Sequence, residues 1–129
     1  MMAHGYALRA FAYFYLIQLY QHPVTASGEV NWDAPGVPMY YVAPDGLTTE
    51  EQEVRKGRNT VRMVYEQIES DLLKAVGLFE QGYVRPTKNY MDASVANGLL
   101  ARYYLLSQQW DKAISAAQKA YAPYALDAK

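Results

Sequence analysis

The acidic and nucleophilic side chains of this chain do not form a recognisable catalytic set. Glu50, Glu51 and Glu53 come nearest to the carboxylate pair of a glycosidase. Carboxylates this close together in sequence are far more typical of a solvated, charged helix face. The sequence also contains no glycine-rich phosphate loop, no nucleophile elbow and no Ser/His/Asp arrangement. We therefore predict that the protein is not an enzyme and has no catalytic residues.

Metal, cofactor and nucleic-acid chemistry are not indicated either. The two histidines, His4 and His22, are too far apart for a pair of metal ligands on one helix, and we expect both at the surface. The chain has no cysteines, which excludes disulfides and thiolate metal sites. Its net charge of −1 offers no concentrated basic surface for phosphates. We predict no metal, no cofactor and no nucleic-acid partner.

Tyrosine is the residue type that most favours a binding function, since it makes up 13 of the 129 residues. Its ring supplies flat apolar area and its hydroxyl can form hydrogen bonds, a combination that suits recognition surfaces. The alternative is that most of the tyrosines pack between helices. Which of the two holds depends on the elements that carry them.

Residues 92–122 predict one helical hairpin of the tetratricopeptide type. Asp92 can cap the first helix, a turn is expected at 107–109, and Trp110 opens the second helix. The small and aromatic residues at the spacings of the repeat are Leu100, Ala101, Tyr104, Trp110, Ala113, Ala117 and Ala120. Small residues let two helices approach closely, and we expect Trp110 to lie between helices. Repeats of this kind bind or scaffold and rarely catalyse reactions.

Two further helices are predicted upstream, over residues 3–21 and 60–82, the later one with Thr60 as a natural N-cap. The later helix has one apolar stripe, formed by Val61, Val64, Tyr65, Ile68, Leu72, Ala75, Val76 and Phe79. The earlier helix is apolar nearly all round, but its run 6–20 carries Arg9 and is shorter than the roughly 20 residues of a membrane span. A helix without a polar face needs covering on every side. Because four helices supply too little cover, we expect a fragment of a longer protein or a partner.

Residues 22–59 form a long connection between the first two helices. The residues that interrupt it are Pro23, Pro35, Pro38, Pro44, Gly28, Gly36, Gly46 and Gly57. Thr48 and Glu51 have capping-box spacing and predict a short helix inside it. A connection this long is usually functional or disordered, and Trp32 argues against disorder. We predict an all-α protein in which residues 1–129 form a single tetratricopeptide-like core of about four main helices, with the connection as a long irregular insertion.

Six stretches of the sequence, taken in order, resemble one protein family. They are Ala-Leu-Arg-Ala-Phe-Ala-Tyr-Phe at 7–14, Gly-Val-Pro at 36–38, Thr-Val-Arg-Met-Val-Tyr-Glu-Gln-Ile-Glu-Ser-Asp-Leu at 60–72, Arg-Pro-Thr-Lys at 85–88, Leu-Leu-Ala-Arg-Tyr-Tyr-Leu at 99–105 and Trp-Asp-Lys-Ala-Ile at 110–114. In this order and at these separations, nearly the whole chain resembles the SusD/RagB family of outer-membrane nutrient-binding lipoproteins.

The resemblance implies a binding function at the cell surface of Bacteroidetes. Members of the family cap a TonB-dependent, SusC-like transporter and hold an oligosaccharide or polysaccharide, or in some branches a peptide, for import. They are several times longer, begin with a lipoprotein signal and an acylated cysteine, and continue into a loop-rich C-terminal part. We expect this chain to be the helical core of such a protein, soluble by itself and held at the outer membrane only through the parent protein's lipid anchor. The alternative is a helical scaffold that docks the transporter or another protein.

The resemblance also implies candidate ligand contacts, led by Trp32 in the long connection. In the glycan binders, aromatic side chains form an arc over the sugar, because the C–H faces of sugar rings stack on flat aromatics while amide and charged groups bind the hydroxyls. Asn31 and Asp33 would bind hydroxyls beside Trp32. The alternatives are that Trp32 anchors the connection to the helices and that Asn31 and Asp33 only form a turn.

Arg9, Tyr40 and Tyr41 complete the candidate ligand-binding site. Arg9 is a rare charge on an apolar helix and could reach the ligand, but an ion pair inside the protein or a contact with a backbone carbonyl is an equal alternative. Tyr40 and Tyr41 could stack on the ligand, or they could simply alternate in a short extended segment.

Overall fold

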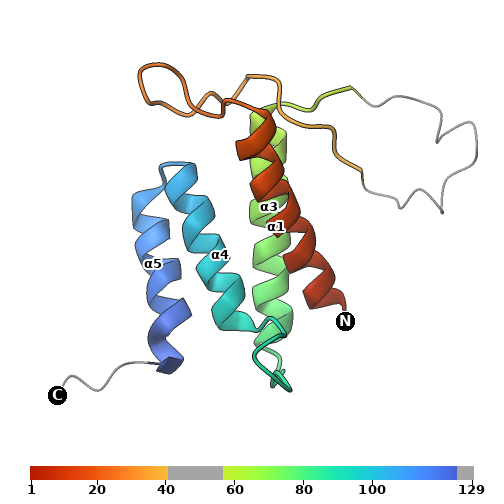
Figure 1. The fold of residues 1–129 in the computed structure, drawn as a ribbon. Helices are drawn as coiled ribbons and strands as arrows, with labels where there is room; N and C mark the ends of the chain where they lie inside the picture. Colours follow the sequence, from red (N-terminus) through yellow and green to blue (C-terminus); the bar gives the residue numbers. More distant parts are fainter. Residues whose placement is uncertain (41–56, 125–129) are drawn as a thin grey trace, which may run out of the picture. The chain divides into compact units, whose positions relative to one another are not determined.

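The computed structural model describes residues 1–40 and 57–124, and this part of the chain is built from α-helices. They are α1 (Met2–Tyr20), α3 (Val61–Phe79), α4 (Ala93–Leu106) and α5 (Trp110–Tyr121), followed by the short 3₁₀ helix η2 (Ala122–Tyr124) (Figure 1). This confirms the predicted all-α fold with four main helices and a long connection after the first. Within the described ranges, no helix has both the length and the apolar character to cross a membrane.

The chain packs as two compact units, each of which contains part of α1 and part of α3. The first, called the helical unit below, comprises Met1–Tyr15 and Tyr65–Lys129. The second, called the connection unit, comprises Leu16–Val64. Each unit is described by itself.

The ends of α3 and α4 follow from the residues that flank them. The hydroxyl of Thr60 accepts a hydrogen bond at 3.2 Å from a backbone N–H in the first turn of α3, as expected of an N-cap. Asp92 caps α4 in the same way, with a bond of 2.9 Å. The predicted helix 60–82 extends too far, because α3 ends at Phe79 and Gly82 adopts a φ of +92° in the turn that follows. This left-handed conformation favours glycine.

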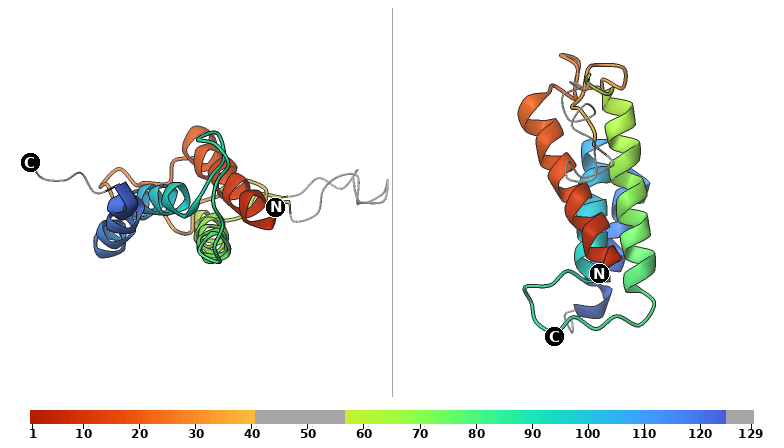
Figure 2. Two further views of the ribbon diagram at one scale, coloured as in Figure 1. Left: turned by 90° about the horizontal axis from the view of Figure 1, so that it is seen from below. Right: turned by 90° about the vertical axis from the view of Figure 1, so that its right-hand side faces the viewer.

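The predicted hairpin is present in the helical unit, where α4 and α5 run side by side (Figure 2). They are joined at residues 107–109, where Gln108 adopts a φ of 59°. The residues of the repeat spacing that are buried as predicted are Leu100, Ala101, Tyr104 and Ala113. The prediction that Trp110 lies between helices is wrong, because Trp110 is 58% exposed and the buried face of α5 consists of Ala113 and Ala116.

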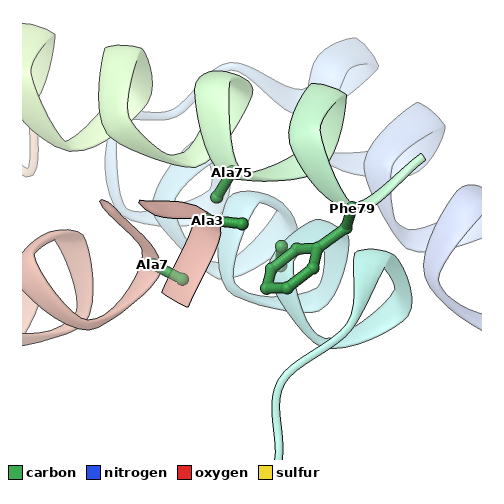
Figure 3. Close-up of a cluster of buried hydrophobic side chains, with 5 residues drawn as sticks. Ala3, Ala7, Ala75 and Phe79 are labelled. Atoms are coloured by element: carbon green, nitrogen blue, oxygen red, sulfur yellow. The ribbon is translucent and has the colours of Figure 1, made fainter. Parts of the chain in front are cut away.

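Small residues bring α1 and α3 together in the helical unit. Ala3 and Ala7 of α1 lie in one buried cluster with Ala75 and Phe79 of α3 (Figure 3). Side chains as short as alanine allow two helices to pack at close range. The C-terminal end of the predicted stripe of α3 is therefore buried against Ala3 and Ala7 of α1.

Helix α1 exposes large apolar side chains elsewhere on its surface. Leu8 is 54% exposed, and Phe11 and Tyr15 are each 38% exposed. The rings of Phe11 and Tyr15 pack against each other with their centroids 4.7 Å apart. The described residues thus bury one face of α1 and leave apolar area on the rest, in keeping with the predicted shortage of cover.

A polar cluster around Glu69 joins α3, α4 and α5. The Glu69 carboxylate accepts hydrogen bonds from the hydroxyls of Tyr104 at 2.8 Å and Tyr103 at 3.4 Å, and it lies 3.4 Å from Lys112 Nζ. Burial raises the pKa of both tyrosines, and the neighbouring Glu69 charge raises the pKa of each further. These two tyrosines pack between helices, as the alternative interpretation of the tyrosine content predicts.

In the connection unit, backbone hydrogen bonds hold the connection against the residues that precede α3. Pro35 and Thr60 form an isolated antiparallel bridge, and the Gly36 N–H donates to the carbonyl of Asn59 at 2.5 Å. A glycine is needed here, because a Cβ at Gly36 would lie 2.8 Å from the Asn59 carbonyl oxygen. The connection is therefore fixed locally by chain pairing.

Candidate ligand-binding site

The indole of Trp32 lies against the guanidinium of Arg62 in the connection unit. The Arg62 Cζ atom is 5.3 Å from the centroid of the Trp32 ring, within the range of a cation–π contact. The backbone N–H of Arg62 also donates to the Trp32 carbonyl at 2.9 Å. Trp32 is thus held to the first turn of α3, and because it is only half-buried, part of the residue stays accessible to a ligand.

Asn31 and Asp33 flank the indole on a turn. The Ala34 N–H donates to the Asn31 carbonyl at 3.2 Å, and the Asn31 N–H donates to the Pro23 carbonyl at 2.7 Å. The Asp33 side chain is 88% exposed, and its carboxylate lies 3.5 Å from Arg62 Nη2. An exposed ion pair of this kind contributes little to stability. The Asp33 carboxylate can therefore exchange its contact with Arg62 for a contact with a ligand.

Local hydrogen bonds on both sides position this turn. Upstream, Val24 and Val30 form an isolated antiparallel bridge around a turn in which Gly28 has a φ of +88°. Downstream, the Asn59 side-chain carbonyl accepts a hydrogen bond from the Met39 N–H at 2.9 Å. Hydrogen bonds in the neighbouring segments therefore fix the position of the turn that carries Asn31, Trp32 and Asp33.

Arg9 belongs to the helical unit and forms an ion pair there. Its Nε is 2.7 Å from Asp71 Oδ2, and its Nη2 is 2.8 Å from Asp71 Oδ1. Asp71 is fully buried and accepts a third hydrogen bond from Gln67 at 2.8 Å. Hydrogen bonding to Asp71 raises the pKa of Arg9, and burial partly opposes that shift. The structure shows the ion pair that was the alternative to a ligand contact for Arg9.

The remaining candidates fall at the edge of the described part of the connection or beyond it. Tyr40 is 49% exposed. The candidates that lie outside the described residues are Tyr41, Glu50, Glu51, Glu53 and the short helix predicted from Thr48. Among the described residues, histidine, aspartate and glutamate side chains do not gather in groups of three that could hold a metal ion.

Arg62 is the residue of this site that the sequence analysis missed. It sits off the apolar stripe of α3, where a charged residue is unremarkable. Its position in the first turn of α3, two residues after the cap Thr60, was the one available signal. With Arg62 included, the site offers an aromatic surface, a guanidinium donor, a carboxylate acceptor and an amide. Such a set can stack on an apolar ring face and bind hydroxyl groups beside it.

The sequence matches one protein family over most of its length. A family described as starch-binding and associating with the outer membrane matches residues 1–105. No protein of curated function matches the chain in sequence.

Three solved structures with similar folds come from Bacteroides species. A SusD-like carbohydrate binding protein from Bacteroides vulgatus is 30% identical with a TM-score of 0.76, over 94% of this chain and 24% of that one. A SusD superfamily protein from Bacteroides thetaiotaomicron is 25% identical with a TM-score of 0.72, over 92% of this chain and 23% of that one. A SusD superfamily protein from Bacteroides fragilis is 31% identical with a TM-score of 0.69, over 92% of this chain and 26% of that one. The chain spans about a quarter of the length of these structures. By sequence and by fold, it belongs to the SusD-like family of starch-binding proteins that associate with the outer membrane.

Proposed function

We propose that this chain takes part in glycan capture at the outer-membrane surface, with Trp32 as the stacking residue. The observation that carries the proposal is the half-buried Trp32, whose indole lies against Arg62, beside the exposed carboxylate of Asp33. The starch-binding description of the family supports a sugar as the ligand, as does the similar structure described as a carbohydrate binding protein.

The proposed binding mode follows from the chemistry of the site. The C–H face of a sugar ring stacks on the indole of Trp32, since both surfaces are flat and apolar. The Asp33 carboxylate accepts hydrogen bonds from hydroxyls, and the Arg62 guanidinium donates to hydroxyl oxygens. Arg62 serves the site twice, because it also holds the indole in place. Asn31 supplies a side-chain amide next to the stacked ring.

Delivery of the glycan to a TonB-dependent, SusC-like transporter is the second part of the proposal. The family's association with the outer membrane supports it, with membrane attachment through a lipid anchor of the parent protein. Exposed apolar side chains on the helices supply candidate docking surface, for example Leu8 and Phe11 on α1 and Ile114 on α5. The same observation favours the scaffold function should the chain not bind glycans.

Isothermal titration calorimetry with maltooligosaccharides tests the proposed glycan site. Trp110→Ala is the matched control for Trp32→Ala, because Trp110 is also accessible but belongs to the helical unit. We expect Trp32→Ala to weaken binding about two- to twelvefold, equivalent to about 0.5–1.5 kcal/mol, and Trp110→Ala to leave it unchanged.

The other outcomes of this titration separate the alternatives. Undiminished binding by Trp32→Ala would contradict the proposed site. Binding of peptides without binding of glycans would assign the site to a peptide. If the chain binds neither glycans nor peptides while its circular dichroism still shows folded helices, the scaffold function would be favoured.

A further inference from the structure

A cleft of about 630 Å³ lies in the helical unit at the start of α1. Its lining includes His4 and Leu8 of α1 and Tyr83, Asn89 and Tyr90 of the loop between α3 and α4. The volume lies in the range of about 300–1,000 Å³ that small-molecule sites occupy. The cleft shares no residue with the candidate site described above.

One wall of this cleft is an aromatic cluster centred on His4. The His4 ring meets the rings of Phe79, Tyr83 and Tyr90 edge-on, with centroid separations of 5.0, 5.3 and 5.9 Å. The Tyr83 hydroxyl lies 3.3 Å from His4 Nε2. His4 was predicted to be a surface group, but it is half-buried in this cluster. Interlocked rings and a hydrogen bond give the cleft a preformed wall.

Two polar side chains of the lining, Tyr90 and Asn89, also face this cleft. Tyr90 is 50% exposed. In the part of the chain that the structure describes, neither the Tyr90 hydroxyl nor the Asn89 side-chain amide forms a hydrogen bond. A tyrosine ring thus stands next to an amide that can donate and accept.

We propose that this cleft is a second carbohydrate site, which binds a short segment of an oligosaccharide independently of Trp32. It rests on the proposed function for its ligand class. The ring of Tyr90 stacks on the C–H face of a sugar, while Asn89 and His4 bind its hydroxyls. A purely apolar ligand would remove water from these polar groups without replacing its hydrogen bonds, which carries a penalty. Met1, Pro86 and Met91 add apolar area to the lining, so the cleft combines apolar surface for the C–H face of a sugar with polar groups for its hydroxyls.

An NMR titration of the whole ¹⁵N-labelled chain with maltotriose tests the second site. We expect saturable shifts of the amide signals of residues 83 and 89–91, and a dissociation constant raised about two- to twelvefold in Tyr90→Ala. Tyr121→Ala is the matched control, because Tyr121 is an exposed tyrosine of the same unit; it should leave the affinity unchanged. Tyr90→Phe keeps the ring and should retain most of the affinity. Trp32→Ala should leave the shifts around the cleft in place.

Each contrary result identifies what fails. Shifts confined to residues 31–33 and 62 would uphold the Trp32 site and overturn the cleft. Cleft shifts caused by a Leu-Phe dipeptide and not by maltotriose would overturn the assignment to a sugar. Equal loss of affinity in Tyr90→Ala and Tyr121→Ala would overturn the role of Tyr90. Shifts at neither site would overturn this proposal together with the proposed function.

Discussion

Replacing Arg9 by methionine distinguishes a stabilising role of this residue from ligand binding. Arg9 donates hydrogen bonds of 2.7 and 2.8 Å to Asp71, whose side chain is fully buried. Methionine fills similar volume but donates nothing. Among the described side chains, Gln67 would be the one donor left to the buried carboxylate.

The expected loss of stability follows from these contacts. Hydrogen bonds to charged groups contribute about 1.5–3 kcal/mol each, and removing one partner of a buried ion pair costs about 3–5 kcal/mol. The Arg9 side chain is 33% exposed, so water already screens part of the interaction. We therefore expect Arg9→Met to lower the free energy of unfolding by about 2–4 kcal/mol. Replacing Asp71 by leucine in the same chain should restore most of the loss, because no buried charge then remains.

Urea unfolding followed by far-ultraviolet circular dichroism measures this effect in both single variants and the double variant, which form a double-mutant cycle. A loss below about 1 kcal/mol for Arg9→Met would contradict a stabilising role of the Arg9–Asp71 ion pair. A double variant whose loss equals the sum of the single losses would contradict it as well. Folded Arg9→Met should bind glycans as the unmodified chain does. A tenfold weaker affinity would instead place Arg9 in the ligand site.

Three further predictions concern Gly36 in the connection, the start of α4 and stability at alkaline pH. Gly36→Ala should lower the free energy of unfolding by about 1–3 kcal/mol in urea titrations, because the methyl group of the alanine would crowd the Asn59 carbonyl. Asp92→Ala removes the cap of α4 and an ion pair, and should lower the thermal midpoint by an amount equivalent to about 1–2 kcal/mol. Burial raises the pKa of Tyr65 and Tyr103 in the folded state. Their contribution to the free energy of unfolding is therefore complete below pH about 10 and is lost as the pH rises further. Urea titrations from pH about 9 to 11 should show the free energy of unfolding falling by up to about 1.4 kcal/mol per pH unit for each tyrosine, with a smaller slope in Tyr103→Phe.

Periodicity predicted the helices well where one face is apolar and the other is polar. The stripe of α3 and the capping residues Thr60 and Asp92 were both visible in the sequence and are both observed. The buried face of α1 was not predictable in this way, because apolar residues surround that helix. Burial follows the position on the helix and not the size of the side chain, because Ala3, Ala7 and Ile17 are buried while Leu8 stays exposed.

Contacts between residues far apart in sequence are what the sequence analysis could not supply. Arg62 and Trp32 are separated by 30 positions, and nothing in the pattern of either segment pairs them. Asp71 lies on the buried side of α3, where the pattern predicts an apolar residue, and its hydrogen bonds with Arg9 and Gln67 explain its presence there. Such pairs depend on how elements meet in space, whereas periodicity reports only the local face of one element.

The contents of the Trp32 site limit the affinity that this chain can show for a glycan. Stacking on an aromatic ring contributes about 0.5–1.5 kcal/mol, and hydrogen bonds to Asp33 and Arg62 contribute about 1.5–3 kcal/mol each. The sum, about 3.5–7.5 kcal/mol, is offset by the lost freedom of the ligand, so we expect a dissociation constant near or above about 1 mM, which corresponds to −4.1 kcal/mol. Titrations therefore need glycan concentrations of about 10 mM. Micromolar binding at this site would therefore require contacts beyond Trp32, Asp33 and Arg62 and would contradict the binding mode proposed here.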